Sequence, residues 1–349
     1  MLSVLQVLAA VTAFSWSASA GTTMTVTNWG DNPSNLPALL VYTPSNLASN
    51  PPIVVGLHPC GGSGPQFMAE FDIPAFADQL GFPVLYPTSG VEDGINCWDC
   101  WSNKSLSHNG GGESQGVAAM VSWALTHFNG DPSRVFAIGA SSGGMFGNVL
   151  AATDPNLFAG IASWSGVPAG CFVGATSSTP ANPDQSCATG AKARTLSAAQ
   201  WAALALGSYP GYTGARPKML ITHGTADTVV SILNFNAQLA QWSTVLGLTF
   251  TRNFTCDPTA NWKLIVYGDG TKLIGFEVAG ATSCRSMTRL RSSSSGFWAA
   301  QQPRPWAQPP LRQDNPFHHG DSQRRLWLVI FFNVLRRSDT DRSPRQFHC

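Results

Sequence analysis

A pentapeptide, Gly-Ala-Ser-Ser-Gly at residues 139–143, is the feature that most constrains this chain. A short apolar run at 135–138 precedes it, and a stretch of small and apolar residues at 144–150, which can begin a helix, follows it. Strand, Gly-x-Ser-x-Gly and helix together place the serine on a sharp, strained turn, where the flanking glycines let strand and helix approach closely. The pattern therefore nominates Ser141 as a nucleophile.

The composition narrows the class of protein. The chain has 349 residues, which is one large domain or two small ones and is long enough to bury a sizeable core. Only 11% of the residues are charged and the formal net charge is +1, so nothing indicates nucleic acid as a partner. The abundance of Gly (34) and Pro (24) favours a loop-rich extracellular enzyme over a cytosolic helical protein. No metal-ligand spacing is evident.

Residues 1–20 are typical of a secretory signal. The segment from Leu2 to Trp16 is mostly apolar, and Ala18-Ser19-Ala20 supplies the small-x-small pattern of a cleavage site. The run is too short for a membrane anchor, so no membrane association is expected. We expect a secreted chain that begins near Gly21.

An oxidising compartment makes disulfides the expected use of the cysteines. Cys171 and Cys187 would close a local loop, whereas the six cysteines before residue 280 allow fifteen pairings in all. The Cys-Trp-Asp-Cys motif at 97–100 has no thioredoxin-like surroundings, so a structural use is favoured over a redox one. Asn103 and Asn253 begin Asn-x-Ser/Thr sequences and are glycosylation acceptors if exposed.

Apolar runs alternate with helical patterns along the chain. This alternation predicts a mostly parallel sheet covered by helices on both faces, which is a three-layer α/β sandwich. A hairpin is expected at 262–278, around Gly-Asp-Gly. The other expected strands are 39–42, 53–57, 83–86, 135–138, 161–164 and 219–222, and the expected helices are 66–80, 113–128, 144–152 and 232–245.

Asp227 follows an expected strand and is the candidate catalytic acid. In α/β-hydrolases the acid comes after the nucleophile in sequence, on a loop past a later strand, where it orients the catalytic imidazole. The alternative is a turn aspartate that caps the helix after Val229. His223 precedes the acid, so we interpret it as a structural residue at the end of the strand.

The glycine-rich loop at 58–64 follows the strand at 53–57. At this point α/β-hydrolases build half of the oxyanion hole from backbone N–H groups. We nominate the N–H of Cys60 and that of Ser142, the residue after the nucleophile. The loop lacks the Lys-Ser/Thr ending of a phosphate-binding P-loop, which disfavours that alternative.

Three tryptophans are candidate platforms for sugar rings. Trp98, Trp101 and Trp164 lie in segments expected to reach the carboxyl edge of the sheet. An exposed aromatic face can stack on a sugar, although tryptophans are more often part of the core.

These motifs together resemble the secreted fungal acetylxylan esterases of carbohydrate esterase family one. Feruloyl esterases and poly(3-hydroxybutyrate) depolymerase-like esterases are the wider relatives. The resemblance covers about residues 25–280 and implies an α/β-hydrolase that removes acetyl groups from xylan without a cofactor, with Ser141 as nucleophile and Asp227 as acid. The matching segments are 58–63, 97–99, 110–114, 131–136, 139–144, 165–171 and 223–230.

The chain departs from the family pattern after Gly280. The family has its catalytic histidine there, in a Gly-His-x-Val-Pro-like segment, whereas this chain continues Ala-Thr-Ser-Cys-Arg-Ser. The composition changes at the same point. Residues 1–280 hold nine basic and fifteen acidic residues, whereas residues 281–349 hold eleven Arg, no Lys and four Asp. The alternatives are a natural disordered basic tail and a shift of reading frame or a misread intron near codon 280.

A shifted frame can supply the missing ending. Back-translation of residues 280–298 with permitted codons, read from the third base, gives Gly-His-Val-Val-Pro-Val-His-Asp-Ala-Ala-Ala-Phe-Val-Phe-Phe-Gly-Leu-Leu. The histidine and the closing Phe-Phe-Gly both occur at the spacing of the family. The tail histidines His318, His319 and His348 lie in Pro- and Arg-rich sequence with little to fix them beside Ser141.

The sequence thus predicts a secreted serine esterase domain at 21–280 that acts as a monomer on acetylated xylan or a related plant polysaccharide. Without the histidine, we expect the chain as written to be crippled or inactive. Two alternatives remain open at this point. One is a feruloyl esterase, which differs in pocket size. The other is a carbohydrate-binding relative that has kept the fold and lost catalysis with the histidine.

Overall fold

The computed structural model describes residues 21–181, 185–258 and 260–280. The expected signal at 1–20 and the tail at 281–349 therefore lie outside the described residues, and nothing in the structure tests them.

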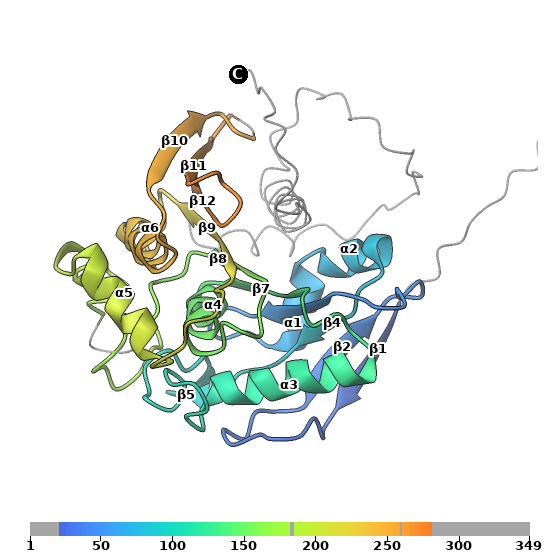
Figure 1. The fold of residues 1–349 in the computed structure, drawn as a ribbon. Helices are drawn as coiled ribbons and strands as arrows, with labels where there is room; N and C mark the ends of the chain where they lie inside the picture. The colour runs from blue at the N-terminus through green and yellow to red at the C-terminus, as the bar shows by residue number, and fades with distance from the viewer. Residues whose placement is uncertain (1–20, 182–184, 259, 281–349) are drawn as a thin grey trace, which may run out of the picture.

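A ten-stranded sheet organises the described chain (Figure 1). Its six central strands, β4, β3, β7, β8, β9 and β12, are parallel, and antiparallel strands flank them at both ends. The expected mostly parallel α/β sheet is confirmed. In spatial order the strands are β1 (Thr22–Val26), β2 (Leu39–Thr43), β4 (Val84–Tyr86), β3 (Ile53–Leu57), β7 (Val135–Ala140), β8 (Gly160–Trp164), β9 (Lys218–Gly224), β12 (Leu273–Val278), β11 (Trp262–Tyr267) and β10 (Phe250–Thr255).

Helices pack on both faces of this sheet. One apolar cluster joins the sheet to α3, α4, α5 and α6, and a second cluster joins the opposite face to α1 and α2. Continuous apolar strands such as β3, which is buried at all five positions, require this double cover. The helices are α1 (Gly64–Glu70), α2 (Ile73–Leu80), α3 (Glu113–His127), α4 (Ser142–Thr153), α5 (Ala198–Gly207) and α6 (Leu233–Val245); smaller elements are β5 (Val91–Glu92), β6 (Ile95–Asn96) and the 3-10 turn Lys192–Arg194.

One expected helix is two helices. The apolar pattern at 66–80 predicted a single element, but α1 ends at Glu70, the backbone of Phe71 is extended, and α2 begins after Asp72. Pro74 explains the break, because proline fits the first turn of a helix and cannot donate to a preceding turn. The hairpin of β11 and β12 has the expected bounds. Sequence reasoning missed β1, β10 and α5.

The second face of the sheet is only partly covered by the described helices. Its cluster extends along the sheet to Trp164 on β8, Leu220 on β9 and Phe276 on β12. Among the described residues, the helices in this cluster are α1 and α2, which pack chiefly on β2, β3 and β4. Figure 1 shows them, in blue, beside the β1–β4 end of the sheet. The cluster thus extends beyond the strands on which α1 and α2 pack.

Buried polar side chains lock α4 in place. Trp242 Nε1 on α6 donates to Asn148 Oδ1 on α4 (2.6 Å), and Asn148 Nδ2 donates to Gln238 Oε1 (2.8 Å). Gln238 Nε2 in turn donates to the carbonyl of Gly166 in the loop after β8 (3.0 Å). Asn148, Gln238 and Trp242 are fully buried, so these bonds are protected from water and fix the position of α4.

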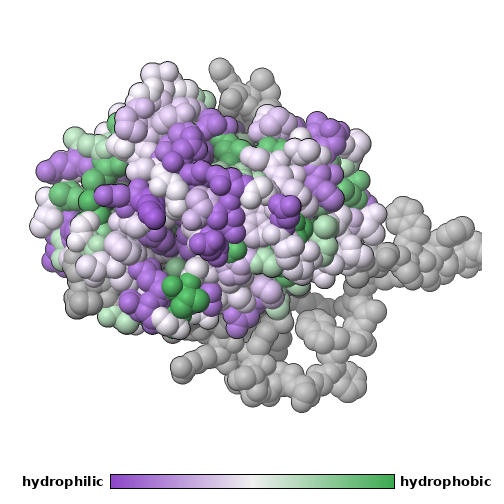
Figure 2. Space-filling view, turned by 90° about the horizontal axis from the view of Figure 1, so that it is seen from below, coloured by the Kyte–Doolittle hydropathy of each residue, from purple (hydrophilic) through white to green (hydrophobic). Residues whose placement is uncertain are grey.

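The face of the molecule in Figure 2 is mixed, with small green patches separated by hydrophilic residues. In the described ranges, no helix has both the length and the apolar character needed to cross a bilayer.

Candidate active site

Ser141 lies on a strained turn between β7 and α4. Its backbone has φ 53° and ψ −120°, in the positive-φ region that non-glycine residues rarely adopt. Its N–H donates to the carbonyl of Trp164 on the neighbouring strand β8 (2.8 Å), and its carbonyl accepts from Met145 in the first turn of α4 (2.8 Å). These bonds maintain the strain and present the side chain at the carboxyl edge of the sheet, as a nucleophile elbow requires.

The glycines of the pentapeptide make this turn sterically possible. A Cβ at Gly139 would collide with the carbonyl of Gly143, and one at Gly143 would collide with the carbonyl of Leu57 on β3. Both obstacles are backbone atoms, which cannot rotate away. The spacing Gly-x-Ser-x-Gly is therefore dictated by the close approach of β7, α4 and β3.

This close approach gives a test of the elbow. Gly143→Ala is expected to lower the free energy of unfolding by about 3 kcal/mol, because the new methyl group must displace backbone. The matched control is Gly207→Ala at the end of α5, where a Cβ meets nothing within 4 Å; it is expected to stabilise by about 0.5 kcal/mol. Urea unfolding measures both, and equal effects of the two variants would contradict the steric account.

The glycine-rich loop after β3 lies beside the elbow, because β3 and β7 are parallel neighbours. His58 at its start is fully buried, and its Nε2 accepts from the N–H of Ser89 (3.0 Å), which leaves the proton on Nδ1 to donate to the carbonyl of Pro59 (2.8 Å). Burial lowers the pKa of His58 to about 4. This histidine is therefore neutral and holds the loop.

Asp227 follows β9, two strands from β7 in the sheet. Its side chain is fully buried, and its Oδ1 accepts from the N–H groups of Val229 and Val230 (2.9 Å each). Oδ2 has no hydrogen-bond partner among the described residues. The turn interpretation is thus correct for one oxygen only. The other is a buried acceptor, which normally has a donor.

The end of β12 lies against the loop of Asp227. Strand β12 pairs in parallel with β9, and the N–H of Thr225 donates to the carbonyl of Val278 (3.0 Å). The N–H of Gly280 donates to Thr225 Oγ1 (3.1 Å). Gly280 thus contacts the loop two positions before Asp227, on the same edge of the sheet as Ser141.

The described histidines all have other roles. His223 on β9 is buried and lies near Asp227, with its Nε2 3.7 Å from Oδ2, but this nitrogen donates to the carbonyl of Val230 (2.8 Å). Burial lowers the pKa of His223, so it is neutral and forms no ion pair with the acid. His58 binds its own loop, His108 binds Asp154 and His127 stacks on Trp123. His318, His319 and His348 lie outside the described residues.

Glu113 is a functional candidate that the sequence did not reveal beyond its place at the start of a helix. Its carboxylate is buried and accepts from the N–H of Gly90 at Oε1 (2.6 Å) and from the N–H of Asp99 at Oε2 (2.8 Å). Burial raises the pKa of Glu113 to about 7. The side chain thus joins the loop that holds His58 to the loop that follows Cys97.

Two of the three tryptophan candidates are wrong as sugar platforms. Trp98 is fully buried, stacked on Phe146 with 4.5 Å between ring centroids, and Trp164 is 1% exposed and packs edge-to-face against Trp262. Neither ring has a face left for a sugar. Trp101 is half-buried at the edge of the core and stays a prediction.

The cysteines form structural links, as expected. Cys171 pairs with Cys187, which confirms the local loop, and Cys60 pairs with Cys97. The sequence had left the Cys60–Cys97 pair open among the fifteen possible pairings. Cys97 and Cys100 do not pair with each other, and Cys100 is a buried thiol. Asn103 and Asn253 are both exposed, as glycosylation requires. In the parts of the chain described, no group of three acidic, His or Cys side chains is arranged to hold a metal ion.

Comparison with known proteins identifies relatives across most of the chain. The family described as Esterase PHB depolymerase matches residues 37–253. "Feruloyl esterase B" of Neurospora crassa is 46% identical over 255 residues, which are 73% of this chain and 85% of that protein. "Acetylxylan esterase A" of Aspergillus oryzae is 42% identical over 253 residues, with 71% and 80% covered. The solved "Acetyl xylan esterase from Aspergillus awamori" superposes with a TM-score of 0.71 and 38% identity over 75% of this chain and 94% of its own.

Proposed function

Because the chain belongs to the Esterase PHB depolymerase family, we propose that residues 21–280 are the body of a secreted serine esterase that removes acetyl groups from acetylated xylan. Two features on one edge of the sheet carry the proposal: the strained Ser141 elbow, and the buried carboxylate of Asp227, whose Oδ2 has no hydrogen-bond partner among the described residues. The names of the relatives support esters of plant polysaccharides as the substrate class.

The chemistry proceeds through an acyl-enzyme. Ser141 Oγ attacks the acetyl carbonyl carbon while a histidine takes its proton, and the N–H groups of Cys60 and Ser142 stabilise the oxyanion. Collapse of the tetrahedral intermediate breaks the bond to the sugar oxygen, which leaves with the proton from the histidine. Water, deprotonated by the same histidine, then releases acetate. Asp227 Oδ2 accepts from the imidazole and stabilises its charged form.

The histidine of this mechanism is absent from the described residues and from the first 37 residues of the tail. We propose that the functional chain continues after Gly280 in the shifted frame, with the ending Gly-His-Val-Val-Pro. One observation supports this: the N–H of Gly280 donates to Thr225 Oγ1, so the chain reaches residue 280 beside the loop of Asp227. The shifted ending supplies both a histidine and the apolar run Ala-Ala-Ala-Phe-Val-Phe-Phe. We call a chain with this ending the restored chain.

A feruloyl ester is the second candidate substrate, because relatives at 46% identity carry that name. The acetyl group stays the first candidate, because relatives at 42% identity carry the name acetylxylan esterase. The third candidate function is that of a carbohydrate-binding protein without catalytic activity.

Product release separates the three. The restored chain is expected to release acetate from acetylated xylan with a kcat/KM at least tenfold above that for ferulate release from methyl ferulate, the scale on which a pocket discriminates by size. Chromatography of acetate and ferulate measures both. Faster ferulate release would support the second candidate, and xylan binding with no product from either substrate would contradict the esterase proposal. Ser141→Ala is the control for background hydrolysis.

A further inference from the structure

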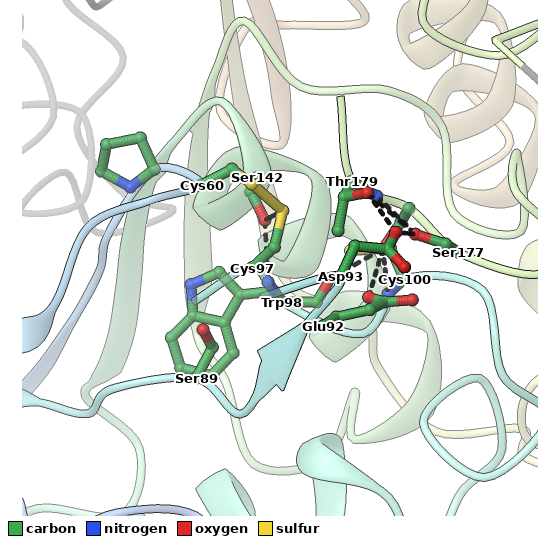
Figure 3. Close-up of a disulfide and its surroundings, with 12 residues drawn as sticks. Cys60, Ser89, Glu92, Asp93, Cys97, Trp98, Cys100, Ser142, Ser177 and Thr179 are labelled. Atoms are coloured by element: carbon green, nitrogen blue, oxygen red, sulfur yellow. Dashed lines mark hydrogen bonds between the residues drawn. A yellow bond between two sulfur atoms is a disulfide. The ribbon is translucent and has the colours of Figure 1, made fainter. Parts of the chain in front are cut away.

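The short segment from Asn96 to Trp98 contacts both halves of the proposed oxyanion hole (Figure 3). On one side, Cys97 forms the disulfide to Cys60, and the carbonyl of Asn96 accepts from the N–H of Gly61 (2.6 Å). On the other side, the N–H of Trp98 donates to Ser142 Oγ (2.9 Å). Cys60 lies on the loop after β3 and Ser142 begins α4, so this segment bridges two elements that are distant in sequence.

The bridge is reinforced along its length. Trp98 Nε1 donates to the carbonyl of His58 (3.0 Å), and Ser142 Oγ lies 3.5 Å from Cys97 Sγ. Cys97, Trp98 and Ser142 are at most 3% exposed, so water does not compete for these contacts. Figure 3 shows the disulfide, the indole of Trp98 and the hydroxyl of Ser142 gathered in one cluster.

Further contacts hold the bridge to the rest of the molecule. Asn96 Nδ2 donates to the carbonyl of Ser89 (3.0 Å), Ser178 Oγ donates to the carbonyl of Trp98 (2.9 Å), and the indole of Trp98 stacks on Phe146 of α4. The N–H of the next residue, Asp99, is bound by Glu113. The segment is thus fixed at both ends and on both sides, which is what a spacer between two catalytic groups needs.

We propose that Cys97 and Trp98 are positioning residues that set the separation of the two oxyanion donors, with the Cys60–Cys97 disulfide as the covalent part of the spacer; this rests on the esterase function proposed above. The donors act only when they lie about 2.7–3.1 Å from the developing oxyanion. A displacement of about 1 Å in such a constellation costs about 100-fold in rate. The disulfide and the Trp98–Ser142 bond restrict this displacement from the two sides.

The second disulfide is a matched control. Cys171–Cys187 also closes a loop in the described structure and is also buried, but its backbone atoms form hydrogen bonds with Pro168, Lys192 and Asn234 rather than with Cys60 or Ser142. Removal of either disulfide lowers stability through the unfolded chain. Only removal of Cys60–Cys97 is expected to change the oxyanion hole, and both alanine variants keep every backbone N–H.

The test uses the restored chain with Cys60→Ala/Cys97→Ala or Cys171→Ala/Cys187→Ala. For the first variant we expect the kcat for 4-nitrophenyl acetate to fall about 100-fold while KM stays within threefold of that of the restored chain, because the oxyanion contacts act in the transition state. The second variant is expected to keep kcat within threefold while its unfolding midpoint falls. Thermal unfolding of each preparation, and kcat per folded molecule, separate positioning from stability.

Ser142→Ala keeps the proposal testable if the first variant does not fold. This change removes only the oxygen that accepts from Trp98, retains the N–H of residue 142, and is expected to lower kcat about tenfold with KM unchanged. Full kcat in either Cys60→Ala/Cys97→Ala or Ser142→Ala overturns the positioning role, as does an equal loss in both disulfide variants. A restored parent without turnover contradicts the proposed function itself, and the positioning proposal falls with it.

Discussion

The restored chain is expected to hydrolyse 4-nitrophenyl acetate with a kcat about 10⁴- to 10⁶-fold above that of the chain as it stands, the range that follows removal of a catalytic histidine. The physical reason is that a serine hydroxyl is a weak nucleophile until a base takes its proton. In the chain as it stands, the described histidines are bound elsewhere, and those at 318, 319 and 348 follow long Pro- and Arg-rich sequence.

The matched control for this prediction is the restored chain with the first histidine of its new ending changed to alanine. It keeps the rest of the shifted ending, so it is expected to fold like the restored chain and to hydrolyse the ester as slowly as the chain as it stands. Initial rates and circular dichroism measure the two properties. Turnover by the chain as it stands at the rate of the restored chain would contradict the assignment of the missing base.

Asp227→Asn in the restored chain is expected to lower kcat about 10⁴-fold with little change in KM. The amide keeps the size of the side chain, and its oxygen can still accept from Val229 and Val230. Its NH₂ group, however, replaces Oδ2 with a donor. The catalytic histidine then loses the acceptor that selects its tautomer and stabilises its charged form.

Asp154→Asn is the control for the loss of a buried carboxylate. Asp154 follows the last residue of α4, is 5% exposed and pairs with His108 at 3.2 Å, so it resembles Asp227 in burial and in having a histidine neighbour. It lies about 18 Å from Ser141 along the axis of the twelve-residue α4. The kcat of Asp154→Asn is expected to stay within threefold of that of the restored chain. A loss of kcat equal to that of Asp227→Asn would contradict the role of Asp227.

Much of the sheet could be predicted from the sequence, because its central strands carry a strong local signal. Strands buried on both faces are continuous apolar runs, and those of β3, β7 and β9 are bounded by polar or glycine-rich turns. Strand β10 has no such signal, since all six of its residues are exposed. Helix α5 was missed although Ser197 and Gln200 form a capping box at its start, which is a readable pattern.

The sequence predicted the motifs of the candidate site but not how its side chains pack. Ser141 and Asp227 could be found because a strained turn and a loop after a strand leave fixed spacings in the sequence. The burial of Trp98 and Trp164 could not, because an indole at the edge of a sheet packs inward or outward depending on partners such as Phe146 and Trp262. The Cys60–Cys97 pairing likewise depends on a contact across 37 residues.

Sequencing of the transcript across codons 275–300 tests the central claim most directly, since the account requires a histidine immediately after Gly280. The predicted result is a message in which the frame that encodes β12 continues into Gly-His-Val-Val-Pro and the apolar run that follows. An unbroken message that encodes Ala281-Thr282-Ser283 and the arginine-rich tail in the same frame as β12 would contradict it.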